Sequence, residues 1–288
     1  MPPPPPFSAA LAAAWAHDVL WGGLMQTVSQ AIYIAGPFFL VGLLLHKMEA
    51  AAQGRLAERF GWKSVLWTGW LGTPIHELSH AAMCLVFRHR IERIALFEPD
   101  SASGRLGYVR HSFDSKSIYQ VVGNFFIGVA PFLGGALTLF GLLWLFEPGA
   151  ARQAMNADGI ASTAASGNLA EAAVQIVRHV FHILARLVTI EHLGTLAFWA
   201  FLYLVLCVGS HLAPSPADYR GTWLGGLLLL GLLLAFNIVF LAAGGRPGTV
   251  TGALASVLGP VFALLVLAAA LNGITTALLL GVTGAVKR

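Results

Sequence analysis

The sequence predicts an all-α polytopic membrane protein with about six transmembrane helices, one small β-hairpin and one interfacial amphipathic helix. Apolar residues make up 57% of the 288 positions, whereas charged residues make up only 10%. Several apolar runs reach the length of about 20 residues that a helix needs to cross a bilayer. These observations predict a multi-pass integral protein of the cell inner or plasma membrane, with the lipid bilayer around it.

Charge and cysteine content narrow the function classes. The formal net charge of +4 comes from dispersed basic residues, without the aromatic-interleaved basic patch that binds nucleic acid. Cys84 and Cys207 lie far apart inside apolar segments, so we expect small core residues rather than a disulfide or a metal pair. No nucleic-acid partner is therefore expected, and the sequence predicts no particular oligomeric state.

The N-terminal segment 1–27 is rich in proline and alanine. It contains Trp15 and Trp21, and tryptophan favours the headgroup region of a membrane, so an interfacial helix is expected here. No basic stretch precedes it, which argues against a cleaved signal peptide. Residues 28–288 are expected to form one membrane-embedded domain with its core at 64–220.

The stretch 64–88 carries the strongest chemical signal. It is long enough to cross a bilayer as a helix, yet its middle contains His76, Glu77 and His80. Ionisable groups inside a membrane segment are costly and therefore indicate function. HELSH has the H-E-x-x-H pattern, in which both imidazoles lie on one helix face and can bind one metal ion. We expect Zn²⁺ at this position, with Glu77 as the base that takes a proton from the attacking water.

Alternation in the segment after this helix predicts a β-hairpin. Ile91, Arg93, Ala95 and Phe97 fall on one side of the first strand, and the turn-rich segment 99–104 separates it from a second strand. A free strand edge can pair with an extended peptide. These four residues are therefore the expected substrate-binding residues.

The remaining spans follow from apolar runs. The six expected crossings are 28–46, which a polar link at 47–63 follows, then 64–88, 117–146, 193–212, 222–243 and 250–282. With this count the 17 lysines and arginines divide almost equally between the two sides of the membrane. The positive-inside rule therefore predicts no orientation.

The segment 147–191 is more polar than the spans. Its later part predicts an amphipathic helix on the membrane surface, because apolar side chains recur at helical spacing at Val174, Val177, Phe181, Leu184 and Val188. We expect His179 and His182 on this helix to be interfacial residues rather than metal ligands, since no third ligand of matching spacing lies nearby.

A catalytic zinc ion needs a third protein ligand and one open position. Asp218 follows Pro214 and Pro216 at the end of an apolar span, and these prolines could turn the carboxylate back into the bundle. Glu98 or Asp100, about twenty residues after His80, is an alternative on the expected hairpin. His211 is a further candidate, and it could instead orient Asp218. The residues alone leave these alternatives open.

These motifs together resemble the site-2 protease family of intramembrane zinc metalloproteases. The resemblance covers roughly residues 64–220: HELSH, the strands after it, the APFLGGAL stretch and the prolines and aspartate of SHLAPSPAD. Ser210 and Tyr219 stand where the family usually has Asn and Gly. The resemblance implies that His76, His80 and Asp218 hold zinc, and that Ser210 occupies a substrate-binding position.

The resemblance also implies a function. The expected activity is hydrolysis of peptide bonds in a transmembrane protein or peptide, whose helix unwinds locally so that an extended segment reaches the hairpin edge. One alternative is a membrane-embedded zincin of another lineage, with Glu98 as ligand and cleavage at the membrane surface. Another is a non-catalytic zinc-binding scaffold or transporter. A scaffold would not need Glu77, and apart from the metal-ligand candidates the spans carry almost no ionisable residues that could form the pathway of a transporter.

Overall fold

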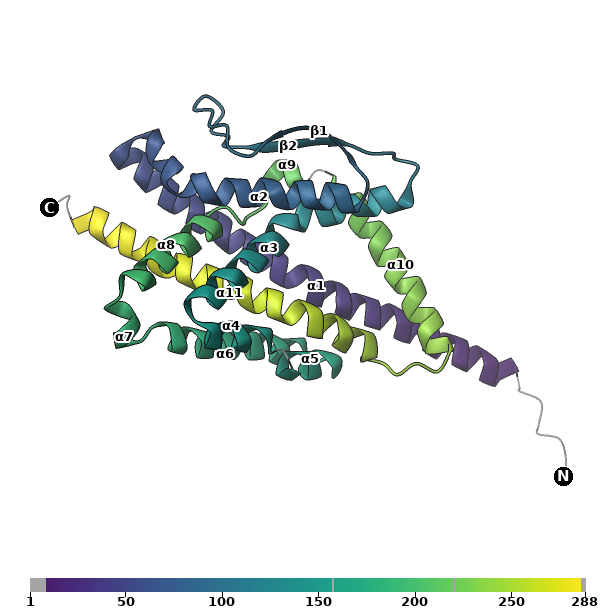
Figure 1. The fold of residues 1–288 in the computed structure, drawn as a ribbon. Helices are drawn as coiled ribbons and strands as arrows, with labels where there is room; N and C mark the ends of the chain where they lie inside the picture. The colour runs from purple at the N-terminus through teal and green to yellow at the C-terminus, as the bar shows by residue number, and fades with distance from the viewer. Residues whose placement is uncertain (1–8, 157, 220, 286–288) are drawn as a thin grey trace.

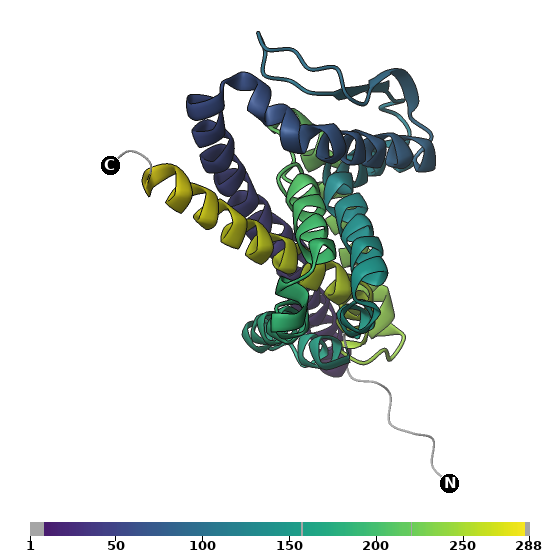
Figure 2. The same ribbon diagram turned by 60° about the vertical axis from the view of Figure 1, so that its left-hand side comes forward.

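The computed structural model describes residues 9–156, 158–219 and 221–285, and these are mostly helical (Figure 1). Figures 1 and 2 show three levels. Helix α2 (Leu66–Val86) and the hairpin of β1 (Arg90–Ala95) and β2 (Tyr108–Ser112) lie across one end. At the other end lie three shorter helices, α4 (Pro148–Met155), α5 (Asp158–Ala165) and α6 (Leu169–Leu187). Longer helices connect the two ends.

Four of the described helices are long and apolar enough to cross a membrane: α1 (Ala9–Phe60), α3 (Ile118–Phe146), α10 (Thr222–Ala242) and α11 (Thr249–Ala285). The sequence prediction of six spans is therefore confirmed only in part. Helix α8 (Leu196–Gly209) has 14 residues, because Gly194 and the N-cap Thr195 separate it from the short α7 (Ile190–Leu193). Helix α2 has 21 residues, but it is not among the four, since the polar residues of the HELSH motif lower its hydropathy.

The first helix differs most from the prediction. No break occurs near residue 28, and the expected polar link at 47–63 is mainly the last part of α1, followed by a short 3₁₀ turn, η1 (Trp62–Val65). The polar residues of this part include Lys47, Glu49 and Gln53, which are favourable in helices, so their polarity does not end the helix. Residues 1–8 of the expected interfacial segment lie outside the described part of the chain.

Aromatic packing joins α1, α3 and α11 in the core. Phe38 on α1 stacks on Phe132 of α3 with ring centroids 5.3 Å apart, and it meets the edge of Phe262 on α11 at 5.1 Å. Phe132 and Phe262 are only 1% and 0% exposed, so the three long helices share one close-packed centre.

A buried polar cluster joins α1, α10 and α11 nearer the end of the molecule at which α4, α5 and α6 lie. The Asn237 amide donates to Gln30 Oε1 at 2.7 Å and to Thr27 at 2.9 Å, and Gln30 in turn donates to Thr251 at 3.2 Å. Interhelical hydrogen bonds of this kind stabilise membrane bundles, in which apolar helix surfaces gain little from leaving lipid.

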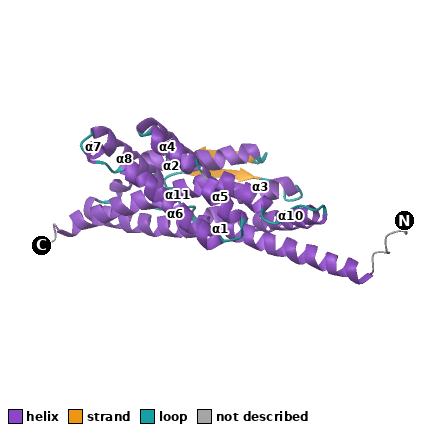
Figure 3. Ribbon diagram, turned by 90° about the horizontal axis from the view of Figure 1, so that it is seen from below, coloured by secondary structure: helices purple, strands orange, loops and turns teal. Residues whose placement is uncertain are grey.

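The predicted hairpin is confirmed, and Figure 3 shows it as the only strand pair in the described chain. One register detail contradicts the expected alternation. Ile91 pairs with His111 and Arg93 pairs with Arg110, so Glu92 is an extra residue in β1. A bulge of this kind moves Ile91 and Arg93 to opposite faces of the hairpin. The prediction that Ile91, Arg93 and Ala95 lie on one face of the hairpin is therefore wrong for Ile91.

Helix α6 is amphipathic, as predicted, but its core-facing residues are Ile176, Val180 and Ile183. Val177 and Phe181 of the predicted apolar stripe point outward and are 62% and 67% exposed. The sequence carries apolar residues on both sides of this helix, so spacing alone did not identify the packed side. Cys84 and Cys207 are free and buried, which confirms their expected place in the core.

Candidate metal centre

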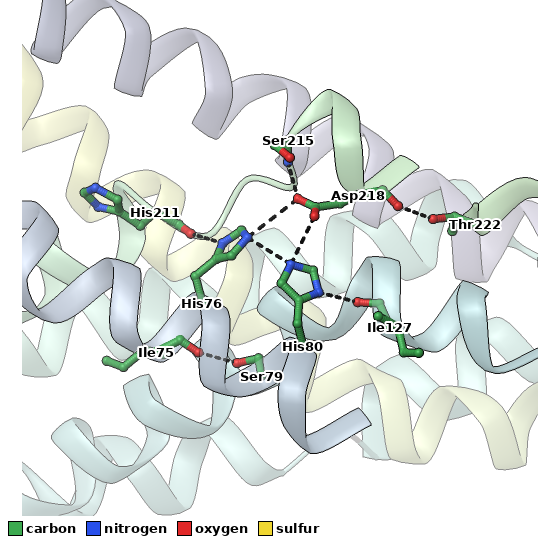
Figure 4. A network of polar contacts seen from close by, with 9 residues as sticks. All are labelled: Ile75, His76, Ser79, His80, Ile127, His211, Ser215, Asp218 and Thr222. Atoms are coloured by element: carbon green, nitrogen blue, oxygen red, sulfur yellow. Dashed lines mark hydrogen bonds and ion pairs between the residues drawn. The ribbon is translucent and has the colours of Figure 1, made fainter. Parts of the chain in front are cut away.

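Three metal-ligand side chains converge where α2 meets α9 (Pro216–Tyr219), as Figure 4 shows. His76 and His80 lie one turn apart on α2, and Asp218 comes from the short helix that follows Pro214 and Pro216. Their ligand atoms all lie within 4.8 Å of one another. Of the third-ligand candidates, the structure thus brings Asp218 to the two histidines.

The hydrogen bonds of the two imidazoles determine their tautomers. His76 Nδ1 lies 2.7 Å from the carbonyl oxygen of His211, and His80 Nδ1 lies 2.7 Å from that of Ile127 (Figure 4). A carbonyl oxygen can only accept, so each Nδ1 donates, and in the neutral imidazole the lone pair is then on Nε2. Carbonyl partners of this kind hold metal-ligating histidines in position.

With both imidazoles neutral, the two Nε2 atoms and the Asp218 carboxylate face one another as acceptors. The two Nε2 atoms are 3.0 Å apart, His80 Nε2 lies 3.2 Å from Asp218 Oδ1, and His76 Nε2 lies 3.6 Å from Asp218 Oδ2. Neutral imidazoles and a carboxylate at these distances repel one another unless a cation lies among them. Ligands at about 2.0 to 2.1 Å around a tetrahedral zinc ion stand about 3.3 to 3.4 Å apart, and the distances between the two Nε2 atoms and from His80 Nε2 to Asp218 Oδ1 lie close to this value.

Asp218 is itself held in place. Its Oδ2 accepts a hydrogen bond of 2.6 Å from the Ser215 backbone N–H, and its own carbonyl oxygen accepts one from the Thr222 hydroxyl at the start of α10. Helix α8 ends at Gly209, before both prolines, and Pro216 is the first residue of α9, a position that proline tolerates well. The carboxylate thus reaches the histidines from an ordered turn.

Close helix contacts surround the histidines. A side chain at Gly72 of α2 would collide with the Cys207 carbonyl oxygen and the His211 ring, and one at Gly134 of α3 would collide with Ser79. Glycine allows such close approach of packed helices. The absence of side chains at these glycines therefore allows α2 to pack closely against α8 and α3.

Glu77 is 8% exposed and lines the same cavity of about 180 Å³ as His76. Gly107, just before β2, covers it: a Cβ there would stand 3.0 Å from Glu77 Cγ and 2.8 Å from the Ala95 carbonyl oxygen. The hairpin therefore lies directly over the Glu77 side chain. Phe97 lies near Gly69 of α2 on the same side.

The predicted strand residues are spread around the hairpin. Arg93 lies on the face of Tyr108 and Arg110, with its guanidinium carbon 5.4 Å from the Tyr108 ring centre. Ala95 shares that face by its pairing with Tyr108, whereas Ile91 lies on the other. Their role in substrate binding stays a prediction.

Ser210 is the C-cap of α8, and its hydroxyl forms a hydrogen bond within this helix end. Its Oγ donates to the Leu206 carbonyl oxygen at 2.7 Å, and the residue is 7% exposed. The hydroxyl hydrogen is thus used within α8 while the oxygen can still accept, and the substrate-binding role of Ser210 stays a prediction.

The alternative acidic ligands lie elsewhere. Glu98 forms an ion pair with Arg93 at 3.7 Å, and the Asp100 carboxylate accepts hydrogen bonds from Ser103 and Ala102 in the hairpin turn. The Ser103 hydroxyl, followed by the Ala102 N–H, keeps the pKa of Asp100 below its ordinary value. Neither carboxylate belongs to the metal-ligand group found within the described residues.

His211 contributes its backbone carbonyl to His76 rather than a ring nitrogen to the ligand group. Sequence analysis missed this role and that of Ile127, because main-chain acceptors leave no residue-type signal. His179 and His182 are not part of the metal-ligand group found within the described residues. Comparison with known protein families, with curated proteins and with solved structures found no match for this chain.

Proposed function

We propose that this protein is a membrane-embedded zinc metalloprotease that hydrolyses peptide bonds of membrane-spanning substrates, in the manner of site-2 proteases. The observation that carries the proposal is the convergence of two imidazole Nε2 atoms and a carboxylate, at zinc-like spacing, beside a buried glutamate. His76, His80 and Asp218 would hold the zinc ion, which supplies a Lewis acid for peptide hydrolysis. Glu77 would accept a proton from the attacking water and deliver it to the leaving amine.

The position of the site favours cleavage close to one membrane surface. Asp218 precedes the first residue of α10 by one helical turn, and α10 has 21 residues. At a rise of 1.5 Å per residue, a helix of this length just spans a hydrocarbon core about 30 Å thick. A metal ion at Asp218 would then lie near the end of the span. This supports surface cleavage, as in the alternative zincin hypothesis, but with Asp218 rather than Glu98 as ligand.

A hydrolysis assay tests the proposal. Purified protein reconstituted with single-span peptides should cleave them, and a zinc chelator should abolish cleavage until Zn²⁺ is restored. Mass spectrometry of the products identifies the cleaved bond. Cleavage that persists after the metal is removed, or no cleavage of any peptide by the zinc-loaded protein, would contradict the proposal.

When α2 is not counted as a membrane span, the distribution of lysine and arginine favours one orientation of the protein in the membrane. Among the described basic residues, those on the side of the metal centre are Lys47, Arg55, Arg59, Lys63, Arg88, Arg90, Arg93, Arg105, Arg110 and Lys116, whereas Arg152, Arg178, Arg186 and Arg246 lie at the opposite end. Short loops rich in lysine and arginine stay on the cytoplasmic side of membranes. We therefore place the metal centre at the cytoplasmic surface.

Cysteine labelling tests this orientation. Ser103 in the hairpin turn and Ser166 between α5 and α6 are both exposed, and the native cysteines are 0% exposed. A membrane-impermeant maleimide should label Ser166→Cys in intact cells and Ser103→Cys only in inverted vesicles. The reverse pattern would place the metal centre on the outer side.

A further inference from the structure

The cavity beside Glu77 also contains polar groups that peptide hydrolysis does not use. It lies between α1, α2, the hairpin turn and the segment after α8, and its walls include Glu49 and Gln53 of α1 and Thr73 of α2. Glu49 is thus a second carboxylate in the cavity that holds Glu77 and His76. Glu49 lies on α1, in the part of the chain where the sequence predicted a polar link.

Glu49 has no cationic partner in the described chain. Its one hydrogen bond is accepted from Gln53 Nε2 at 2.8 Å, and none of the ion pairs between described residues includes it. Glu49 is partly buried, and a partly buried carboxylate without a cation is unfavourable, so a positive group entering the cavity would reduce that penalty.

Two further residues of the cavity wall carry polar atoms that lack hydrogen-bond partners. Thr73 Oγ1 and His211 Nε2 are both buried and unpaired, and the whole of Thr73 is only 5% exposed. His211 Nδ1 lies 3.2 Å from Ser210 Oγ and 3.3 Å from the Cys207 carbonyl oxygen. The Ser210 hydroxyl donates to the Leu206 carbonyl oxygen, so Nδ1 can donate to both oxygens, and the neutral ring then has its lone pair on Nε2. Native proteins rarely leave buried polar atoms unpaired, so these atoms are free to take a polar partner.

The cavity therefore offers acceptors: a carboxylate, an imidazole lone pair and a hydroxyl oxygen. An ammonium group has three donors and no acceptor, and a guanidinium group has five donors and no acceptor. We infer that Glu49, with Thr73 and His211, binds a lysine or arginine side chain of the substrate close to the scissile bond. This inference rests on the proposed protease function and names a substrate preference for it.

Substrate series test this preference. Single-span peptides carry Lys, Leu or Glu in turn at each position within three residues of the cleaved bond. Wild-type protein should prefer Lys at one position, and Glu49→Gln should lower kcat/KM for that peptide about 10- to 100-fold, with little change for the Leu peptide. Glu49→Gln keeps a partner for Gln53, and Glu58→Gln, exposed on the same helix, is the matched control.

Two results would overturn the inference. One is the absence of a preference for a basic residue at every position, and the other is a preference that Glu49→Gln leaves unchanged. Peptide binding to Glu77→Gln protein separates this inference from the protease proposal, because binding needs no hydrolysis. Preferential binding of the Lys peptide, lost when Glu49→Gln is added, would support the cation site even if no peptide were cleaved.

Discussion

Asp218→Ala is expected to reduce bound zinc from about one ion per chain to a small fraction, because catalytic zinc needs three protein ligands. Glu98→Ala is expected to keep the zinc, since Glu98 contacts Arg93 rather than the histidines. Elemental analysis of detergent-purified wild-type and variant proteins gives the ratio directly. The same measurement on His80→Ala should match Asp218→Ala.

The control for Asp218→Ala is Asp218→Asn. The asparagine oxygen can still accept the hydrogen bond from the Ser215 N–H, so the turn before α10 should remain. Loss of zinc in both variants, with unchanged helix content by circular dichroism, would assign the effect to the lost carboxylate. Zinc retained by Asp218→Ala but lost from Glu98→Ala would move the third ligand to the hairpin.

Glu77→Gln is expected to lower the rate of peptide hydrolysis by about 10²- to 10⁴-fold, the usual contribution of a general acid–base residue. The amide has nearly the same shape as the carboxylate but cannot take a proton from water. Zinc content should stay at the wild-type value, because Glu77 is not in the ligand group. Steady-state cleavage of a reconstituted peptide, together with elemental analysis, measures both quantities.

Leu78→Met, a neighbouring change on a side chain that is 51% exposed, serves as the control for effects of altering α2. Equal activity of Glu77→Gln and wild-type protein would exclude Glu77 as the base. A zinc-containing protein in which neither form cleaves any peptide would instead favour the non-catalytic scaffold.

The sequence predicted the metal-ligand candidates because their chemistry depends on side-chain type and spacing. HELSH placed His76 and His80 on one helix face, and the resemblance to site-2 proteases selected Asp218 among several acidic residues. The carbonyl oxygens of His211 and Ile127, which hold the imidazoles, could not be predicted. Every residue has a carbonyl group, so only the packed structure shows which ones are used.

Span count and strand register were harder to predict from local patterns. Apolar length did not distinguish α2, which lies across the end of the bundle, from helices such as α3 that connect the two ends. The bulge at Glu92 depends on pairing with β2, which a single strand does not encode. The continuation of α1 to Phe60 followed helix propensity rather than polarity.

The glycines behind the ligand helix have an evolutionary consequence. Gly72 and Gly134 touch no ligand atom, yet any side chain there would displace the backbone or side chains on which the histidines depend. Natural variation in this protein should therefore be as restricted at these two glycines, where no side chain fits, as at the metal-ligand residues. A lineage could exchange an exposed hairpin carboxylate such as Glu98 far more freely than it could add one methyl group at Gly72.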